Sequence, residues 1–109
     1  MATSYKVLGQ SVPTANTLTT VYTVPASTEA VVSTIAVCNL GPAPTTYKIA
    51  ILTDGGSVAN ADYIVYDASI APQDTMTFTL GLTLNAADLI RTESFSGLVS
   101  FNIFGSEIA

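Results

Sequence analysis

The stretch TMTFTLGLT, residues 75–83, alternates hydrophobic side chains with hydroxyl-bearing or small ones. Successive side chains of an extended strand point to opposite faces. One face therefore carries Met76, Phe78, Leu80 and Leu82, and the other carries Thr75, Thr77, Thr79, Gly81 and Thr83. A strand that faces water usually carries some Lys, Glu or Asn outward, and this one carries none. We expect this Thr-rich face to contact a subunit or a partner; the alternative is a plain solvent-facing edge.

The rest of the chain repeats this pattern between turn signals that recur about every ten to thirteen residues, the spacing of many short strands. The turns include SVPTAN, PAST, GPAP, DGGSVANA, APQD, NAAD and SFSG. Between them lie segments rich in Val, Ile, Thr, Tyr and Phe, which favour strands. The predicted strands are residues 4–10, 17–24, 30–40, 45–53, 62–70, 75–83, 88–94 and 97–104.

These segments predict an all-β fold: one antiparallel β-sandwich domain over residues 1–109, of jelly-roll or related Greek-key type. No window shows the apolar spacing of an amphipathic helix, and the intervals are too short for the crossovers of parallel strands. Tyr47, Ile49 and Ile51 form one predicted core face, and Val99, Phe101 and Ile103 form another. The strand order is left open by the sequence.

The composition argues against several classes of function. Only 10% of the residues are charged, and the net charge is -5 with three cations, Lys6, Lys48 and Arg91. Three scattered cations do not make a nucleic-acid surface or attract an anionic membrane. The chain also lacks histidine, the commonest general base and metal ligand, so we expect no enzyme, no cofactor and no small-molecule substrate. We see no signal peptide and no spanning segment, and we expect folding in a cytoplasm.

Four acidic or thiol side chains and the aromatic rings are the remaining candidates for chemistry or binding. Asp54 and Asp62 fit turn residues better than calcium ligands, because the loop lacks the alternating acids of a calcium site, although a cation between subunits stays open. Asp67 is expected to be partly buried beside a hydroxyl or Arg91. Cys38 is expected to be a small buried residue, with a reactive or intermolecular thiol as the alternative. The aromatic rings are expected to pack in the core rather than to bind sugars.

Three stretches, TVYTVPASTEAVVSTIAVCN, ADYIVYDASIAPQDTMTFTLGLTLNAADLIRT and SFNIFGSEI, resemble a family of small structural proteins from tailed bacteriophages. Similar modules occur in phage tail, baseplate and fibre proteins. The resemblance implies a virion component without enzymatic activity. Because the chain carries no coiled coil or fibre-like extension, a decoration (cement) protein fits best: a homotrimer bound to the major capsid protein on the outside of the shell.

The candidate contact residues are the Thr-rich row, Thr75, Thr77, Thr79, Gly81 and Thr83, together with Tyr5 and Lys6. Tyr5 and Lys6 enter because the chain ends, residues 1–6 and 105–109, could form arms that reach a neighbour. Two other functions remain open at this point. One is a tail, neck, baseplate or fibre-associated module, and the other is a host-glycan adhesion module with exposed tyrosines.

Overall fold

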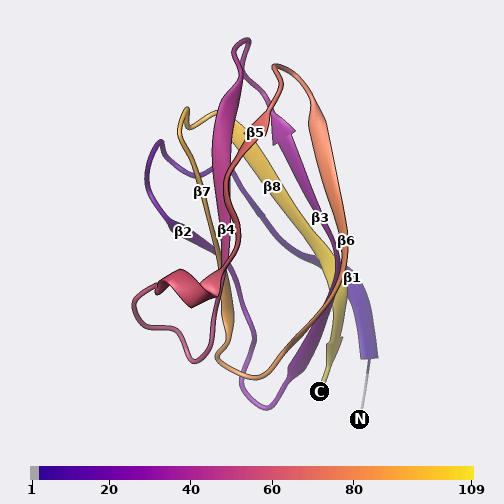
Figure 1. The fold of residues 1–109 in the computed structure, drawn as a ribbon. Coiled ribbons are helices and arrows are strands. Elements are labelled where there is room, and N and C mark those ends of the chain that lie inside the picture. The colour runs from indigo at the N-terminus through magenta and orange to yellow at the C-terminus, as the bar shows by residue number, and fades with distance from the viewer. Residues whose placement is uncertain (1–2) are drawn as a thin grey trace.

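The computed structural model describes residues 3–109 and contains eight β-strands in two antiparallel sheets that face each other (Figure 1). Sheet A has the strand order β1–β8–β3–β6, and sheet B has the order β2–β7–β4–β5. The strands are β1 (Thr3–Ser11), β2 (Thr19–Thr23), β3 (Glu29–Asn39), β4 (Thr45–Leu52), β5 (Tyr63–Ile70), β6 (Thr75–Leu84), β7 (Leu89–Ser94) and β8 (Val99–Ile108). A 3-10 turn, η1 (Asn60–Asp62), precedes β5. The predicted all-β sandwich is confirmed, and each predicted segment overlaps one strand.

The strand order identifies the sandwich as a jelly roll, which the sequence had left open. Strands β4 and β5 form an antiparallel pair at the centre of the chain. The flanking strands pair in the same nested way: β3 with β6, β2 with β7, and β1 with β8. These nested pairs fall alternately in sheet B and sheet A. The four nested antiparallel pairs are therefore wrapped around one core so that successive pairs lie in opposite sheets, which is the jelly-roll arrangement.

Pairing of β1 with β8 brings the two ends of the chain together. Thr3 lies opposite Ile108, and Lys6 lies opposite Gly105 (Figure 1). The arms considered from the sequence are therefore wrong for residues 3–6 and 105–108, which are paired strand with backbone hydrogen bonds inside sheet A. Met1 and Ala2 lie outside the described residues.

The core lies between the sheets and follows the alternation of the strands. Val99, Phe101 and Ile103 are fully buried, as predicted. The Tyr47 ring packs edge-on against Phe78 and Phe101, with centroids 6.4 and 6.1 Å away. Such edge-to-face pairs add to the hydrophobic burial of the rings. These three rings thus hold the two sheets together at the centre of the sandwich. Tyr5, Tyr66 and Phe95 are 85%, 63% and 67% exposed, so the expectation that the aromatic rings pack in the core is wrong for them.

A β-bulge shifts the alternation in the middle of sheet A. The pairing of β3 with β6 and β8 changes register between Val32 and Thr34, so Val32 and Ile35 both point inward and are fully buried. The shifted phase turns Cys38 toward the outer face, where it is half-buried beside Thr75. The expectation of a buried Cys38 is therefore wrong, because Val37 and Asn39 take the inward positions on either side of it.

A second, smaller cluster covers one end of the outer face of sheet B. Ala50, Leu52 and Leu89 are buried there under Val58 and Tyr63, from the segment that leads into β5. Ala50 alternates with the core residue Ile49 and therefore lies on the outer side of β4. The segment between β4 and β5 folds back over it and excludes water.

Candidate contact surfaces

The predicted Thr-rich row lies on the outer face of sheet A, along β6. Thr75, Thr77, Thr79, Gly81 and Thr83 are all exposed. The alternate residues Phe78, Leu80 and Leu82 are half-buried and pack against the core. β6 is an edge strand, bonded to β3 on one side. The row is therefore accessible to a partner, both across its face and along its backbone edge.

Tyr5 and Lys6 lie on β1, at the opposite edge of sheet A, separated from β6 by β8 and β3. With strands about 4.8 Å apart, that separation is roughly 14 Å. The Tyr5 side chain is 85% exposed on the outer face, where it pairs with Ser106. Lys6 has the opposite phase and turns toward Glu107, with Nζ 2.6 Å from Oε1. The two candidate contacts, the Thr-rich row and the pair Tyr5 and Lys6, thus lie at opposite edges of one sheet.

Glu107 closes the seam between the sheets at the β1–β2 edge. Its carboxylate forms an ion pair with Lys6 of β1. It also accepts a hydrogen bond from the Tyr22 hydroxyl of β2 over 2.5 Å. The bond from Lys6 and then the bond from Tyr22 lower the pKa of Glu107. Burial, followed by the interaction with Glu107, raises the pKa of Tyr22. Both pKa values move away from neutral pH, so Glu107 stays ionised and Tyr22 stays protonated there. The cluster is therefore suited to holding strands together.

A shallow groove of about 480 Å³ crosses the outer face of sheet A beside Tyr5. Its lining includes Tyr5, Val7, Val31, Ser33, Phe104 and Ser106. Val7 and Phe104 are 46% and 36% exposed, although both are large and hydrophobic. Lys6 also lines the groove, but its ammonium group is paired with Glu107. The groove therefore offers an apolar surface with little free charge.

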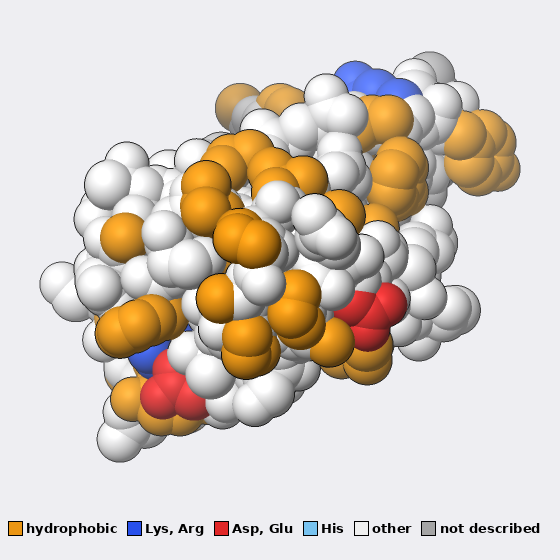
Figure 2. Space-filling model, turned by 90° about the horizontal axis from the view of Figure 1, so that it is seen from above, with side chains coloured by type: hydrophobic (Ala, Val, Ile, Leu, Met, Phe, Trp, Pro, Cys, Tyr) orange, Lys and Arg blue, Asp and Glu red, His pale blue; other side chains and the backbone are white. Residues whose placement is uncertain are grey.

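The loops at one end of the sandwich form a second apolar surface, which sequence reasoning missed. These loops join β1 to β2, β3 to β4, β5 to β6 and β7 to β8. Four large hydrophobic residues on them are about half exposed or more: Val12 (53%), Leu40 (52%), Phe95 (67%) and Leu98 (47%). We call this surface, defined by Val12, Leu40, Phe95 and Leu98, the apolar loop end. Figure 2 looks onto it and shows hydrophobic side chains gathered across the surface, with charged side chains at its margins.

A buried asparagine ties these loops together. The Asn39 side chain is 1% exposed. Its amide nitrogen donates to the carbonyls of Ala43 and Ala71 over 2.9 and 3.1 Å, and its oxygen accepts from the Gly41 N–H over 3.0 Å. The Leu40 N–H also donates to the Leu98 carbonyl over 2.7 Å. Because these bonds are made within the folded chain, the loop end is held in one shape before any partner arrives.

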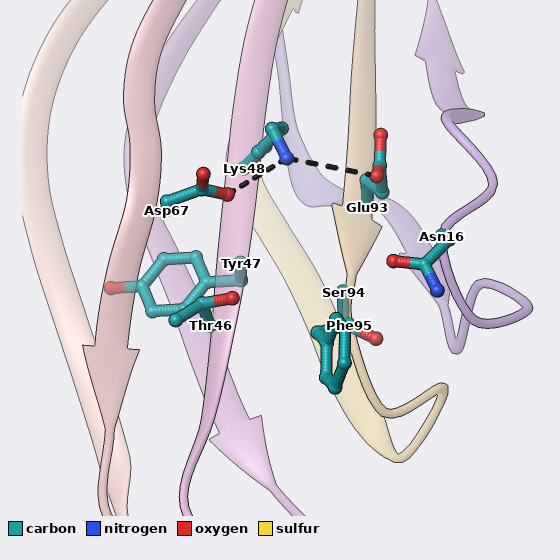
Figure 3. A pocket seen from close by; sticks show the side chains of 8 residues that line it. All are labelled: Asn16, Thr46, Tyr47, Lys48, Asp67, Glu93, Ser94 and Phe95. Atoms are coloured by element: carbon teal, nitrogen blue, oxygen red, sulfur yellow. Dashed lines mark ion pairs between the residues drawn. The ribbon is translucent and has the colours of Figure 1, made fainter.

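A small polar pocket of about 150 Å³ lies on the outer face of sheet B (Figure 3). Lys48 of β4 lies between Asp67 of β5 and Glu93 of β7, with Nζ 2.7 Å from Asp67 and 3.7 Å from Glu93. Nζ also lies 4.8 Å from the centroid of the Tyr66 ring. The hydrogen bond with Asp67 is the largest cause of the raised pKa of Lys48. The lysine is thus held in its charged form as a bridge across three neighbouring strands.

The expected environment of Asp67 is wrong in both its partner and its burial. Asp67 pairs with Lys48, and its side chain is 50% exposed. Arg91 instead donates to the Thr20 hydroxyl over 3.1 Å and to the Gly56 carbonyl over 2.8 Å. The reason is a bulge: Asp67 adopts a positive φ of 54°, and the pairing of β4 with β5 shifts on both sides of Ile49. Simple alternation cannot anticipate such a shift.

Residues 3–109 contain neither a metal-binding cluster of side chains nor a helix that could span a membrane. Within that range, no three His, Cys, Asp or Glu side chains lie together in a way that could hold a metal ion. In the same residues, no helix is long and apolar enough to cross a membrane. Comparison with known proteins gave no match to a family model, to a curated protein or to a solved structure.

The fold and these surfaces define an all-β jelly-roll protein that presents apolar surface at one end and on one sheet. The sequence contains a signal for the loop end within its turns. Leu40 directly precedes the turn GPAP, and Phe95 lies within the turn SFSG. A large hydrophobic residue at such a position has no inward place to occupy.

Proposed function

We propose that this chain is a structural protein of a tailed-bacteriophage virion. It decorates the outer shell and stabilises it by non-covalent contact with the major capsid protein. The observation that carries the proposal is the apolar loop end, where Val12, Leu40, Phe95 and Leu98 are exposed on loops that the Asn39 amide holds in place. The resemblance of the sequence to small phage structural proteins supports the same reading.

Leaving these side chains in water costs free energy that a partner could recover. Burying a large hydrophobic side chain fully is worth roughly 1.5 to 3 kcal/mol. Exposed apolar side chains that gather on one surface are typical of protein contacts, whereas scattered ones are ordinary. The loop end is also pre-shaped, so a partner that buries it does not have to order flexible loops.

The size of the loop end favours binding by many copies. The Cα atoms span 27 by 19 Å across the two shorter axes of the molecule. A narrow end of this size is expected to bury less than the about 800 Å² per partner of a standard interface. One copy is therefore expected to bind weakly. Copies repeated over a regular lattice gain avidity when they are linked to each other, so modest contacts add up to stable decoration.

The test uses virions that lack this protein, to which purified protein is added back. Wild-type protein is expected to bind in many copies and to raise the temperature at which the shell releases its DNA. The variant Leu98→Asp places a charge in the loop end and is expected to weaken binding at least tenfold. Ser57→Asp is the matched control, because Ser57 is exposed in the segment after β4, at the opposite end of the sandwich.

Three results would refute the proposal. In the first, Leu98→Asp binds the shell as well as wild-type protein. In the second, cryo-microscopy finds the protein on the tail but not on the head. In the third, shells without the protein resist heat and osmotic shock as well as decorated ones. Circular dichroism of both variants checks that a loss of binding is not a loss of folding.

A further inference from the structure

Strand β6 leaves an open backbone edge on sheet A. It runs for ten residues from Thr75 to Leu84 and pairs with β3 on one side. It contains neither a charged residue nor a proline. A strand edge of this kind presents a row of unpaired N–H and C=O groups, which is a template for pairing with another chain.

The other three edge strands carry features that discourage such pairing. β1 contains Lys6 and changes register beside Leu8. β2 is only five residues long. β5 contains Asp67 at positive φ and two register shifts. β6 has one shift, after Thr79, and keeps a continuous register with β3 from Thr75 to Thr79. Charges, bulges and short length are the usual protections of a sheet edge, so β6 is the least protected of the four.

The inward side chains of β6 are also incompletely covered. Met76 is 42% exposed, and Phe78, Leu80 and Leu82 are half-buried. Their neighbours on β3, Val37, Ile35 and Val32, have no exposed surface. The core of the sandwich is therefore open along the side of β6. Another strand beside β6 would close it.

We propose that a second copy of this chain occupies this edge: two β6 strands pair antiparallel about a twofold axis and join two copies of sheet A into one eight-stranded sheet. The pairing is self-complementary. A twofold axis places Thr and Gly opposite Thr and Gly on the outer face, and apolar side chains opposite apolar side chains on the inner face. The charged side chains Lys48, Arg91 and Glu93 belong to sheet B, away from this contact.

This assembly differs from the trimer that the sequence resemblance implies. An edge that pairs with itself needs a twofold axis, so it produces a dimer and cannot close a ring of three. The inference stands on β6 alone and does not depend on binding to a shell. In the proposed decoration protein, it would supply the link between copies that gives avidity.

The test measures the mass of the purified protein in solution by light scattering after size exclusion, at about 100 μM. We expect twice the chain mass of 11.3 kDa. Met76→Lys places a charge on the inward side of the open edge and is expected to weaken dimerisation at least tenfold. Val7→Lys is the matched control, because Val7 is 46% exposed on β1, at the other edge of the same sheet. This control is expected to remain dimeric.

Hydrogen exchange gives a second measurement that needs no variant. Amides of residues 75–84 that point away from β3 are expected to exchange more slowly as the protein concentration rises. The proposal is overturned by a wild-type monomer at 100 μM, by a trimer, by exchange in β6 that is independent of concentration, or by a dimer that Val7→Lys dissociates and Met76→Lys does not. Each of these results leaves the shell-binding test of Leu98→Asp unaffected.

Discussion

Replacing Asn39 by alanine tests whether one buried amide holds the loop end in shape. The substitution removes the partner of the Gly41 N–H and of the carbonyls of Ala43 and Ala71, at 3.0, 2.9 and 3.1 Å. A buried polar group left without a partner costs roughly 1 to 3 kcal/mol. The bond to Gly41 is buried and the bonds to Ala43 and Ala71 are partly buried, so water can compensate two of the three groups in part. We expect a loss of about 3 kcal/mol in the free energy of unfolding.

The assay is urea unfolding at neutral pH, followed by circular dichroism. A loss of about 3 kcal/mol is a large part of the roughly 5 to 15 kcal/mol that stabilises a typical domain. The matched control is Asn102→Ala, because the Asn102 side chain accepts one exposed bond from Gln10 on the outer face of sheet A. It is expected to change stability by less than about 0.5 kcal/mol. The reasoning is refuted if Asn39→Ala costs less than 1 kcal/mol, or no more than the control.

Three further predictions concern the core, the strand contacts and the seam. Phe101→Ala, which empties a fully buried site, should lower the free energy of unfolding by about 3 to 5 kcal/mol in the same assay. Gly105→Ala should lower the melting temperature, since a Cβ there would overlap the Val31 carbonyl oxygen, whereas Gly81→Ala, with open space around it, should not. The folded pKa of Glu107 is lowered, so its contribution is present above the unfolded pKa of about 4.3 and is lost as pH falls through the folded pKa. Chemical unfolding between pH 7 and 2.5 should show the stability gap between wild-type protein and Glu107→Gln closing on acidification; a constant gap would contradict the assigned role.

The local periodicity of the sequence determined much of the fold. Val99, Phe101 and Ile103 occupy alternate positions between turn signals, and all three are fully buried. The same two-residue period placed the row of Thr77 and Thr79 on an exposed face of β6. These predictions held because the side-chain alternation of a strand is a property of neighbouring residues alone.

The sequence misplaced residues wherever a bulge shifts that alternation. Cys38 turns outward after the register change at Ser33, and Asp67 meets Lys48 after a turn into positive φ. The sequence carries no clear mark of either bulge. A bulge increases the local twist and shifts the register between paired strands, so its position depends on the strands that lie alongside.

Only the tertiary structure decided which distant segments meet. The sequence offered Tyr5 and Thr77 as candidate contact residues without placing them relative to each other, and the jelly-roll order puts them at opposite edges of sheet A. It gave no sign that the Asn39 amide would reach Ala71, or that Leu40 and Leu98 would lie on the same end. Strand identity follows from a few adjacent residues, whereas strand order and loop contacts follow from how the whole chain closes around one core, and no short window of sequence contains that information.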